Sequence, residues 1–240
     1  MTAFVLTPPA IPSVAVNGET GRFPVRRIFC VGRNYAAHAR EMGRDPDREL
    51  PFFFTKPADA VVDSGTTVPY PPETADLHHE IELVVAIGAE GFDVPVEAAH
   101  RVVYGYAVGI NLTRRDLQLE ARDKGRPWDW GKAFDLSAPC SPIRKVEQVG
   151  HPSKGRIWLA VNDAVKQDAD LAELIWPVPD IISILSRSMR LMPGDLIYTG
   201  TPAGVGTLVA GDRVTGGIDG LGTIMLTIGE RVQERIPEVA

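Results

Sequence analysis

Long apolar runs and concentrated basic stretches are both missing from this sequence of 240 residues. A membrane-spanning helix needs roughly 20 consecutive apolar residues, and the chain does not start with a basic segment followed by an apolar one, so we expect no membrane partner and no signal peptide. The formal net charge of −6 argues against nucleic acid as a main partner. These features predict a cytoplasmic protein, and they leave anionic small molecules open as substrates.

Cysteine is equally scarce. Cys30 and Cys140 are the only two, and they lie far apart in the sequence. Without a His/Cys spacing pattern, two distant thiols form neither a zinc motif nor a disulfide framework, so we expect both to be buried and reduced. Proline and glycine, by contrast, are plentiful at 20 and 23 residues, which predicts many turns and excludes a bundle of long helices.

Short apolar segments predict a fold that is mainly β with short helices (α+β). Strands are expected at residues 27–31, 52–55, 80–87, 102–110, 157–161, 196–199, 213–214 and 222–228. The last two are expected to be broken by Gly216-Gly217 and Gly220. Helices are expected at 35–42 (capped by Asn34 and ended by Gly43), 111–122 and 180–190. We expect an N-terminal arm over residues 1–24 and one domain of catalytic size over 25–240.

Glu80 and Glu82 stand one residue apart at the start of an apolar segment. Side chains alternate faces along a strand, so both carboxylates point to the same side. Adjacent carboxylates repel each other and are costly to bury without compensation, and a hard divalent cation such as Mg²⁺ would resolve both problems. The alternative is a polar, solvent-facing start of a strand, which glutamate commonly forms. The spacing alone leaves both interpretations open.

Three basic side chains outside this segment are candidates for chemistry. His38 lies three residues before Glu41 in an expected helix, an arrangement that suits a histidine general base oriented by a carboxylate, although a solvated surface pair has the same spacing. Lys132 lies among aromatic residues, where a lysine either stabilises a developing oxyanion or extends its ammonium to the surface. Lys56 ends an apolar strand.

Residues 200–206 form a glycine-rich loop directly after a strand. The loop lacks the Gly-Lys-Ser/Thr ending of a phosphate loop and the Gly-x-Gly-x-x-Gly spacing of a dinucleotide fold, so we reject nucleotide binding. Two interpretations remain. The loop is an ordinary β-turn, or its backbone N–H groups and the Thr201 hydroxyl hold a small carboxylate.

The order of these motifs is more specific than any one of them. Along the chain run Gly-Arg-Asn-Tyr-x-x-His-x-x-Glu from residue 32, Phe-Thr-Lys-Pro from 54, His-Glu-x-Glu from 79, Thr-Arg-Arg-Asp-Leu-Gln from 113, Gly-Lys-Ala-Phe-Asp from 131, Pro-Gly-Asp from 193 and Thr-Gly-Thr-Pro-x-Gly-Val-Gly from 199. Together they resemble the fumarylacetoacetate hydrolase superfamily, and within it the acylpyruvase and fumarylpyruvate hydrolase branch. The resemblance spans roughly residues 25–230.

The resemblance implies a mixed β-sandwich roll, a homodimer and a divalent metal, Mg²⁺ or Mn²⁺. By this resemblance Glu80 and Glu82 are metal ligands, His38 and Glu41 are the water-activating pair on a mobile helix, and Lys132 lies near the metal and the reacting carbonyl. The positions that match substrate-binding residues are Arg33, Arg115, Gln118 and Thr201, with Lys56 beside the pocket.

One position departs from the family pattern. The third metal ligand of the family is an aspartate, which falls at Asn111 here. An amide oxygen can coordinate a hard cation but brings no charge, so we expect weaker metal binding. A naturally weak metal site, an altered chemistry or metal preference, and an impaired enzyme are all compatible with this change.

The activity that the resemblance implies is hydrolytic C–C cleavage of a 2,4-diketo acid, with fumarylpyruvate and water giving fumarate and pyruvate. The alternative within the family is β-keto acid decarboxylation, tautomerisation or isomerisation, as in oxaloacetate decarboxylases. Decarboxylation needs no activated water, so the presence of both His38 and Glu41 favours hydrolysis. A non-catalytic relative that only binds keto acids or partners is a more distant alternative, and Asn111 alone favours it.

Overall fold

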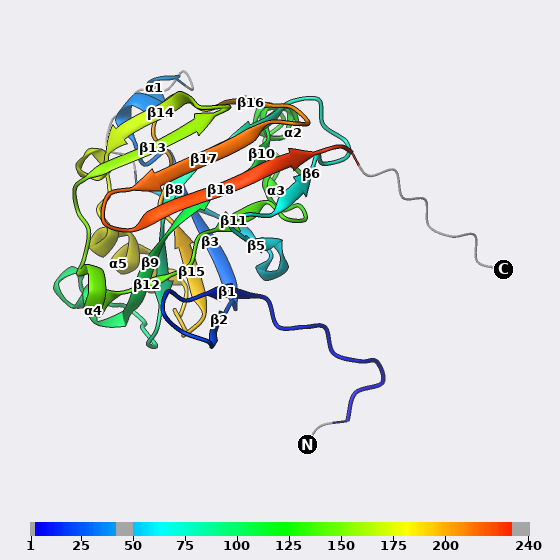
Figure 1. The fold of residues 1–240 in the computed structure, drawn as a ribbon. Helices are drawn as coiled ribbons and strands as arrows, with labels where there is room; N and C mark the ends of the chain where they lie inside the picture. Colours follow the sequence, from blue (N-terminus) through cyan, green and yellow to red (C-terminus); the bar gives the residue numbers. More distant parts are fainter. Residues whose placement is uncertain (1–2, 42–49, 232–240) are drawn as a thin grey trace.

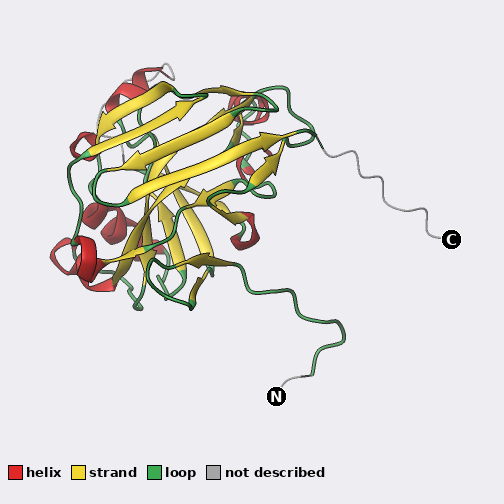
Figure 2. Cartoon of the chain, viewed as in Figure 1, coloured by secondary structure: helices red, strands yellow, loops and turns green. Residues whose placement is uncertain are grey.

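Two large β-sheets packed across one another form the body of the protein in the computed structural model (Figures 1 and 2), which describes residues 3–41 and 50–231, without the side chains of 39–41. The eight-stranded sheet contains, in spatial order, β4 (Phe52–Lys56), β3 (Arg27–Gly32), β15 (Asp195–Tyr198), β8 (Ile81–Ile87), β9 (Val103–Ile110), β11 (Ala138–Cys140) and β5 (Val61–Asp63), with β12 (Arg144–Lys145) also beside β9. The five-stranded sheet contains β14 (Ala164–Asp170), β13 (Arg156–Val161), β17 (Arg213–Ile218), β18 (Gly222–Gly229) and β6 (Thr67–Pro69).

Two small sheets and short helices complete the structure. The small sheets are β10 (Thr113–Arg114), β7 (Leu77–His79) and β16 (Gly206–Leu208), and the pair β1 (Ser13–Ala15) and β2 (Arg22–Pro24). The α-helices are α1 (Ala36–Glu41), α2 (Arg115–Asp123), α3 (Asp129–Lys132), α4 (Val146–Val149) and α5 (Val178–Ser188). The 3₁₀ helices are η1 (Ala58–Ala60), η2 (Val96–Val102) and η3 (Leu171–Glu173). Strand pairs of both directions occur, so the sheets are mixed and the expected fold class is confirmed.

The central strand β8 is buried along its whole length. Leu83 and Val85 pack into the core between the two large sheets, whereas Val84 and Ala86 pack into a second core on the opposite face of the eight-stranded sheet. A strand covered on both faces carries a continuous apolar run rather than an alternating one, which is the pattern that made this segment recognisable in the sequence. Burial of each large apolar side chain favours folding by about 1.5–3 kcal/mol.

All the expected strands are present, but three local interpretations were wrong. Asn34 does not cap α1, because its amide donates to the carbonyls of Trp176 and Thr199 and its carbonyl accepts from the Trp176 N–H. Helix α2 starts only after residue 114, because the preceding residues pair with β7. Gly216-Gly217 does not break β17, whose hydrogen-bonded register is continuous from Arg213 to Ile218. The expected end of α1 at Gly43 lies outside the described residues.

The N-terminal segment has two parts. Strands β1 and β2 pair with each other, and Val14 and Phe23 are buried in the second core, so this hairpin packs on the body. Residues 3–11 instead extend away from it (Figure 1). Cys30 and Cys140 are buried and unpaired, as expected. Within the described part of the chain, no helix is long and apolar enough to cross a membrane.

Gly109 in β9 leaves room for the side chains of Val84 and Tyr198, which belong to the second core. A Cβ added there would lie 2.6 Å from the Tyr198 ring and 2.5 Å from a methyl group of Val84. We therefore expect Gly109→Ala to lower the free energy of unfolding by about 2 kcal/mol through overpacking, measured by urea denaturation. Gly21→Ala is the matched control, because a Cβ at Gly21 meets nothing within 4 Å. Equal stability of the two variants would contradict this account of the packing.

Candidate active site

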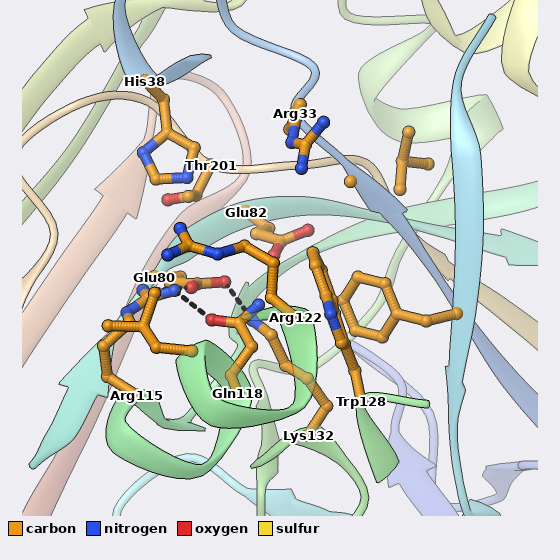
Figure 3. A pocket seen from close by; sticks show the side chains of 14 residues that line it. Arg33, His38, Glu80, Glu82, Arg115, Gln118, Arg122, Trp128, Lys132 and Thr201 are labelled. Carbon is orange, nitrogen blue, oxygen red and sulfur yellow. Dashed lines mark hydrogen bonds and ion pairs between the residues drawn. The ribbon is translucent and has the colours of Figure 1, made fainter. Parts of the chain in front are cut away.

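Glu80 and Glu82 lie at the junction between β7 and β8, and both are buried, with exposed fractions of 4% and 1%. The interpretation of this segment as a solvent-facing strand start is therefore wrong. Both carboxylates line a cavity that is partly open to solvent (Figure 3). The structure brings six other predicted residues into this cavity: Arg33, His38, Arg115, Gln118, Lys132 and Thr201.

Glu80 is held as a carboxylate by two cations. The Lys132 ammonium donates to its Oε2 at 2.7 Å, and the Arg115 guanidinium donates to its Oε1 at 2.5 Å. Burial alone would raise the pKa of Glu80, but the charges of Lys132 and Arg115 outweigh it and hold that pKa well below its usual range. Lys132 also donates to the Thr113 hydroxyl at 2.6 Å. The ammonium of Lys132 is thus fixed inside the cavity and does not reach the surface.

Glu82 has neutral partners instead. It accepts from the Gly200 N–H at 2.6 Å and from the Asn111 side-chain amide at 2.9 Å. Burial and the neighbouring Glu80 charge raise the pKa of Glu82 to about 7. The glycine-rich loop therefore does hold a carboxylate through its backbone, but that carboxylate belongs to the protein. Gly200 has a φ of +102°, and a Cβ there would lie 2.7 Å from the Cβ of Asn34, so the contact requires glycine.

Asn111 lies beside Glu82 and has a side-chain oxygen without a hydrogen-bond partner. Its side-chain amide nitrogen is used by Glu82, while its Oδ1 is buried without a hydrogen-bond partner, a costly state for a polar atom. Among the described residues, no three His, Cys, Asp or Glu side chains come together to hold a metal, so a cation beside Glu80 and Glu82 would need a ligand of another kind, such as this amide oxygen. Two carboxylates and a carbonyl-type oxygen are ligands that hard divalent cations prefer, and the residues present therefore fit such an ion.

Thr201 is positioned by a residue that no sequence motif indicated. Gln167 on β14 is fully buried, and its amide donates to the Thr201 hydroxyl and the Pro202 carbonyl, both at 2.8 Å. The carbonyl oxygen of Gln167 contacts His79 Nδ1 at 3.1 Å and accepts from the Ile81 N–H at 3.0 Å. One side chain thus ties the Thr201 loop to the segment that carries both carboxylates.

Lys56 lies behind the cavity wall rather than in it. Its ammonium donates to the backbone carbonyls of Leu112 and Lys132, and it lies 5.3 Å from the centre of the Phe134 ring. Burial lowers the pKa of Lys56 to about 7. Lys56 thus lies beside the pocket, and its contacts join the chain beside Asn111 to the end of α3; a role of Lys56 in substrate binding stays a prediction.

The structure describes the side chain of His38 but not that of Glu41. His38 lies on α1 and faces the cavity from the side opposite Glu80 and Lys132 (Figure 3). Glu41 is the last residue of α1, but its side chain lies outside the described part, so its pairing with His38 stays a prediction. Arg115 and Gln118 share the first turn of α2, where the guanidinium donates to the Gln118 carbonyl oxygen at 2.5 Å.

The sequence from residue 27 to residue 229 matches the profile described as Fumarylacetoacetate (FAA) hydrolase C-terminal. The chain belongs to this fumarylacetoacetate hydrolase family. The match covers both large sheets and every cavity residue named above, so the resemblance inferred from seven motifs is confirmed.

Alignments with individual members of the family extend over most of the chain. A fumarylpyruvate hydrolase from Ralstonia sp is 51% identical over 190 residues, which span 78% of this chain and 98% of that protein. Oxaloacetate tautomerase FAHD1, mitochondrial, from Arabidopsis thaliana is 39% identical over 207 residues, spanning 86% and 92%. The structure of fumarylpyruvate hydrolase from Pseudomonas aeruginosa in complex with Mn²⁺ and pyruvate superposes with a TM-score of 0.94 at 52% identity, covering 95% of this chain and all of that one.

The sequence analysis did not predict two further residues that line the cavity. Arg122 in the last turn of α2 and Trp128 before α3 both line the cavity (Figure 3). Arg122 lies two helical turns after Arg115, a spacing that puts both on the same face of α2. That periodicity was available in the sequence, whereas the position of Trp128 follows only from the contact of α3 with α2 and β4.

The burial of His79 predicts a pH dependence of stability. Burial lowers the pKa of His79 from 6.5 to about 4. Below pH 6.5 the unfolded chain therefore binds a proton that the folded chain does not, and stability falls as the pH drops toward 4. We expect His79→Gln to remove about 2 kcal/mol of the stability difference between pH 7 and pH 4.5, measured by urea denaturation at both values. His100→Gln controls for the loss of an exposed histidine, and an unchanged pH dependence in His79→Gln would exclude this effect.

Proposed function

We propose that this chain is a metal-dependent hydrolase that cleaves a C–C bond of a 2,4-diketo acid, with fumarylpyruvate and water giving fumarate and pyruvate. The observation that carries the proposal is one cavity in which His38 faces the buried carboxylates Glu80 and Glu82. The fumarylpyruvate hydrolases of Ralstonia sp and Pseudomonas aeruginosa, at 51% and 52% identity, support the same reaction. Like the solved relative, this chain would take a divalent cation, Mn²⁺ or Mg²⁺.

Glu80, Glu82 and the Asn111 carbonyl oxygen would hold the cation, which supplies Lewis acidity to the oxygens of a pyruvoyl group. In this arrangement Asn111 contributes its unpartnered Oδ1 without adding charge. Lys132 and Arg115 stay bonded to Glu80 and favour its ionised form. The Gly200 N–H orients Glu82 from behind.

His38 supplies the base. We propose that it takes a proton from water, whose oxygen forms a bond to the acyl carbonyl carbon. The C–C bond to the methylene then breaks, and its electron pair leaves with the pyruvoyl part as an enolate that takes up a proton to give pyruvate. Lys132, fixed on the opposite side of the cavity by Glu80 and Thr113, places a positive charge where the negative charge develops.

A second reaction of the family is favoured by a specific observation. The tautomerase of Arabidopsis thaliana is 39% identical to this chain, and oxaloacetate chemistry, by decarboxylation, tautomerisation or isomerisation, uses the same carboxylates and lysine without an activated water. Parallel assays with fumarylpyruvate and oxaloacetate separate the two functions. We further propose that the chain acts in the cytoplasm as a homodimer, which sedimentation measurements would test.

His38→Ala tests the hydrolytic step. We expect the variant to lose fumarylpyruvate hydrolysis by at least about 100-fold, since general-base catalysis contributes 10²–10⁴-fold, while Mn²⁺ binding is retained. Absorbance loss of fumarylpyruvate and isothermal titration of Mn²⁺ measure the two properties. His100→Ala serves as the matched control, because His100 is exposed and lies outside the cavity. Hydrolysis at the wild-type rate in His38→Ala would remove His38 from the mechanism.

Asn111→Asp tests the metal site through two effects of opposite sign. A third anionic ligand should tighten Mn²⁺ binding by about tenfold or more, measured by isothermal titration. In the presence of EDTA the same change should lower the free energy of unfolding, because the amide donor to Glu82 is lost and a third carboxylate joins two others. If Mn²⁺ affinity is unchanged, Asn111 is not a ligand.

A further inference from the structure

The amide of Gln167 has a partner at each of its four hydrogen-bonding positions. Its nitrogen donates to the Thr201 hydroxyl and to the Pro202 carbonyl, both at 2.8 Å. Its oxygen accepts from the Ile81 N–H at 3.0 Å and contacts His79 Nδ1 at 3.1 Å. The side chain is fully buried, so a lost partner could not be replaced by bulk water, and each contact is costly to remove.

Two backbone groups decide which end of this amide is the nitrogen. The Pro202 carbonyl can only accept a hydrogen bond, and the Ile81 N–H can only donate one. Turning the amide over would place two donors against each other at Ile81 and two acceptors against each other at Pro202. The nitrogen of Gln167 therefore faces the glycine-rich loop and donates to Thr201 Oγ1. The hydroxyl oxygen of Thr201 is thus used as an acceptor.

This orientation leaves the proton of the Thr201 hydroxyl for the cavity. Among the described residues, the bond from Gln167 is the only hydrogen bond that Thr201 Oγ1 makes. Thr201 is buried and lines the same cavity as Glu80 and Lys132 (Figure 3). Its branched Cβ restricts the side chain to few rotamers. A hydroxyl held in this way is ready to donate to an accepting oxygen of a ligand, and the bond is strongest when that oxygen is charged.

The backbone of the glycine-rich loop has supports other than Gln167. At one end the Gly200 N–H donates to Glu82 at 2.6 Å. At the other end Gly206 pairs with His79 where β16 meets β7. Loss of the Gln167 amide is therefore expected to leave the loop in place and to release the hydroxyl that the amide holds.

We propose that Gln167 is a positioning residue that fixes the Thr201 hydroxyl as a hydrogen-bond donor to an anionic oxygen of the ligand. Gln167 does not line the cavity itself, so it acts through Thr201. The inference rests on the proposed function for the identity of the ligand, whose pyruvoyl carboxylate is the group that Thr201 would bind. Without Gln167 the hydroxyl is free to rotate, and ordering it on binding lowers the affinity.

A double-mutant cycle in pyruvate binding to the Mn²⁺-loaded protein tests this role. Gln167→Met removes the amide at similar side-chain length, and we expect it to raise the Kd of pyruvate by about 5- to 20-fold. Thr201→Val removes the hydroxyl and should raise the Kd by about 10- to 100-fold, the range of a hydrogen bond to a charged group. In the Thr201→Val protein, the further change Gln167→Met should alter the Kd by less than about twofold, because both changes remove one interaction. Isothermal titration with pyruvate measures all four proteins.

Two further readouts separate positioning from a general structural effect. Mn²⁺ affinity, measured by isothermal titration, should be the same in all four proteins. With fumarylpyruvate as substrate, Gln167→Met should raise KM by about the same factor as the Kd of pyruvate and change kcat by less than about threefold, because a contact made equally before and during the reaction affects KM alone. Gln148→Met is the matched control, since Gln148 is exposed on α4 and lies outside the cavity.

Three results would overturn the proposal. They are an equal loss of pyruvate affinity from Gln167→Met with and without the Thr201 hydroxyl, an unchanged affinity in Gln167→Met, and no pyruvate binding by the wild-type Mn²⁺-loaded protein. If Gln167→Met does not fold, Gln167→Glu replaces it in the cycle. Its added charge acts in both backgrounds, so a larger loss when the hydroxyl is present supports the proposal, and an equal loss refutes it.

Failure of the proposed function gives a different result. A wild-type protein that does not hydrolyse fumarylpyruvate would refute the hydrolase assignment. The cycle in pyruvate binding needs no turnover, and it would still decide whether Gln167 acts through Thr201.

Discussion

The buried charge of Glu80 is the constraint on which the rest of the site depends. This carboxylate receives Arg115 from α2 and Lys132 from α3, two elements that are distant from β8 in sequence. Breaking a buried ion pair by removal of one partner costs about 3–5 kcal/mol. Helices of nine and four residues have little stability of their own. We infer that docking onto Glu80 helps to fix both helices, so the ion pairs that keep the carboxylate ionised also shape the cavity.

Glu82, two residues along, shows how the environment separates two identical side chains. It has an amide and a backbone N–H for partners, and its pKa lies near 7 rather than well below its usual range. Glu82, whose charge is incompletely compensated, therefore lies beside Asn111, whose amide oxygen has no hydrogen-bond partner. Both unmet requirements are of the kind that a hard cation satisfies. This coincidence, more than the count of acidic ligands, supports a metal site with asparagine in it.

The sequence predicted the parts of the structure whose signal is local. Buried strands such as β8 show as apolar runs, and the cavity residues His38 and Lys132 belong to ordered motifs. The β14 strand was not predicted, because Gln167 is its only buried residue and its other positions are polar or partly exposed, so no apolar period marks it. Gly216 suggested a break in β17, but its missing side chain instead makes room for Ile81. A Cβ at Gly216 would lie 2.7 Å from a methyl group of Ile81. Interactions between distant segments, such as Gln167 with Thr201, leave no local trace in the sequence.

The basic side chains of the cavity also affect how a ligand arrives. The whole chain carries a net charge of −6, so an anion at long range meets a weakly repulsive protein, whereas at the cavity it meets basic side chains such as Arg122. At physiological ionic strength charges act over roughly 8 Å, and attraction is thus confined to the last part of the approach. Such a field orients a molecule with charge at both ends before it makes contact. The association rate of a correctly oriented ligand is therefore higher than diffusion without this field would give, and this rate falls as salt is added.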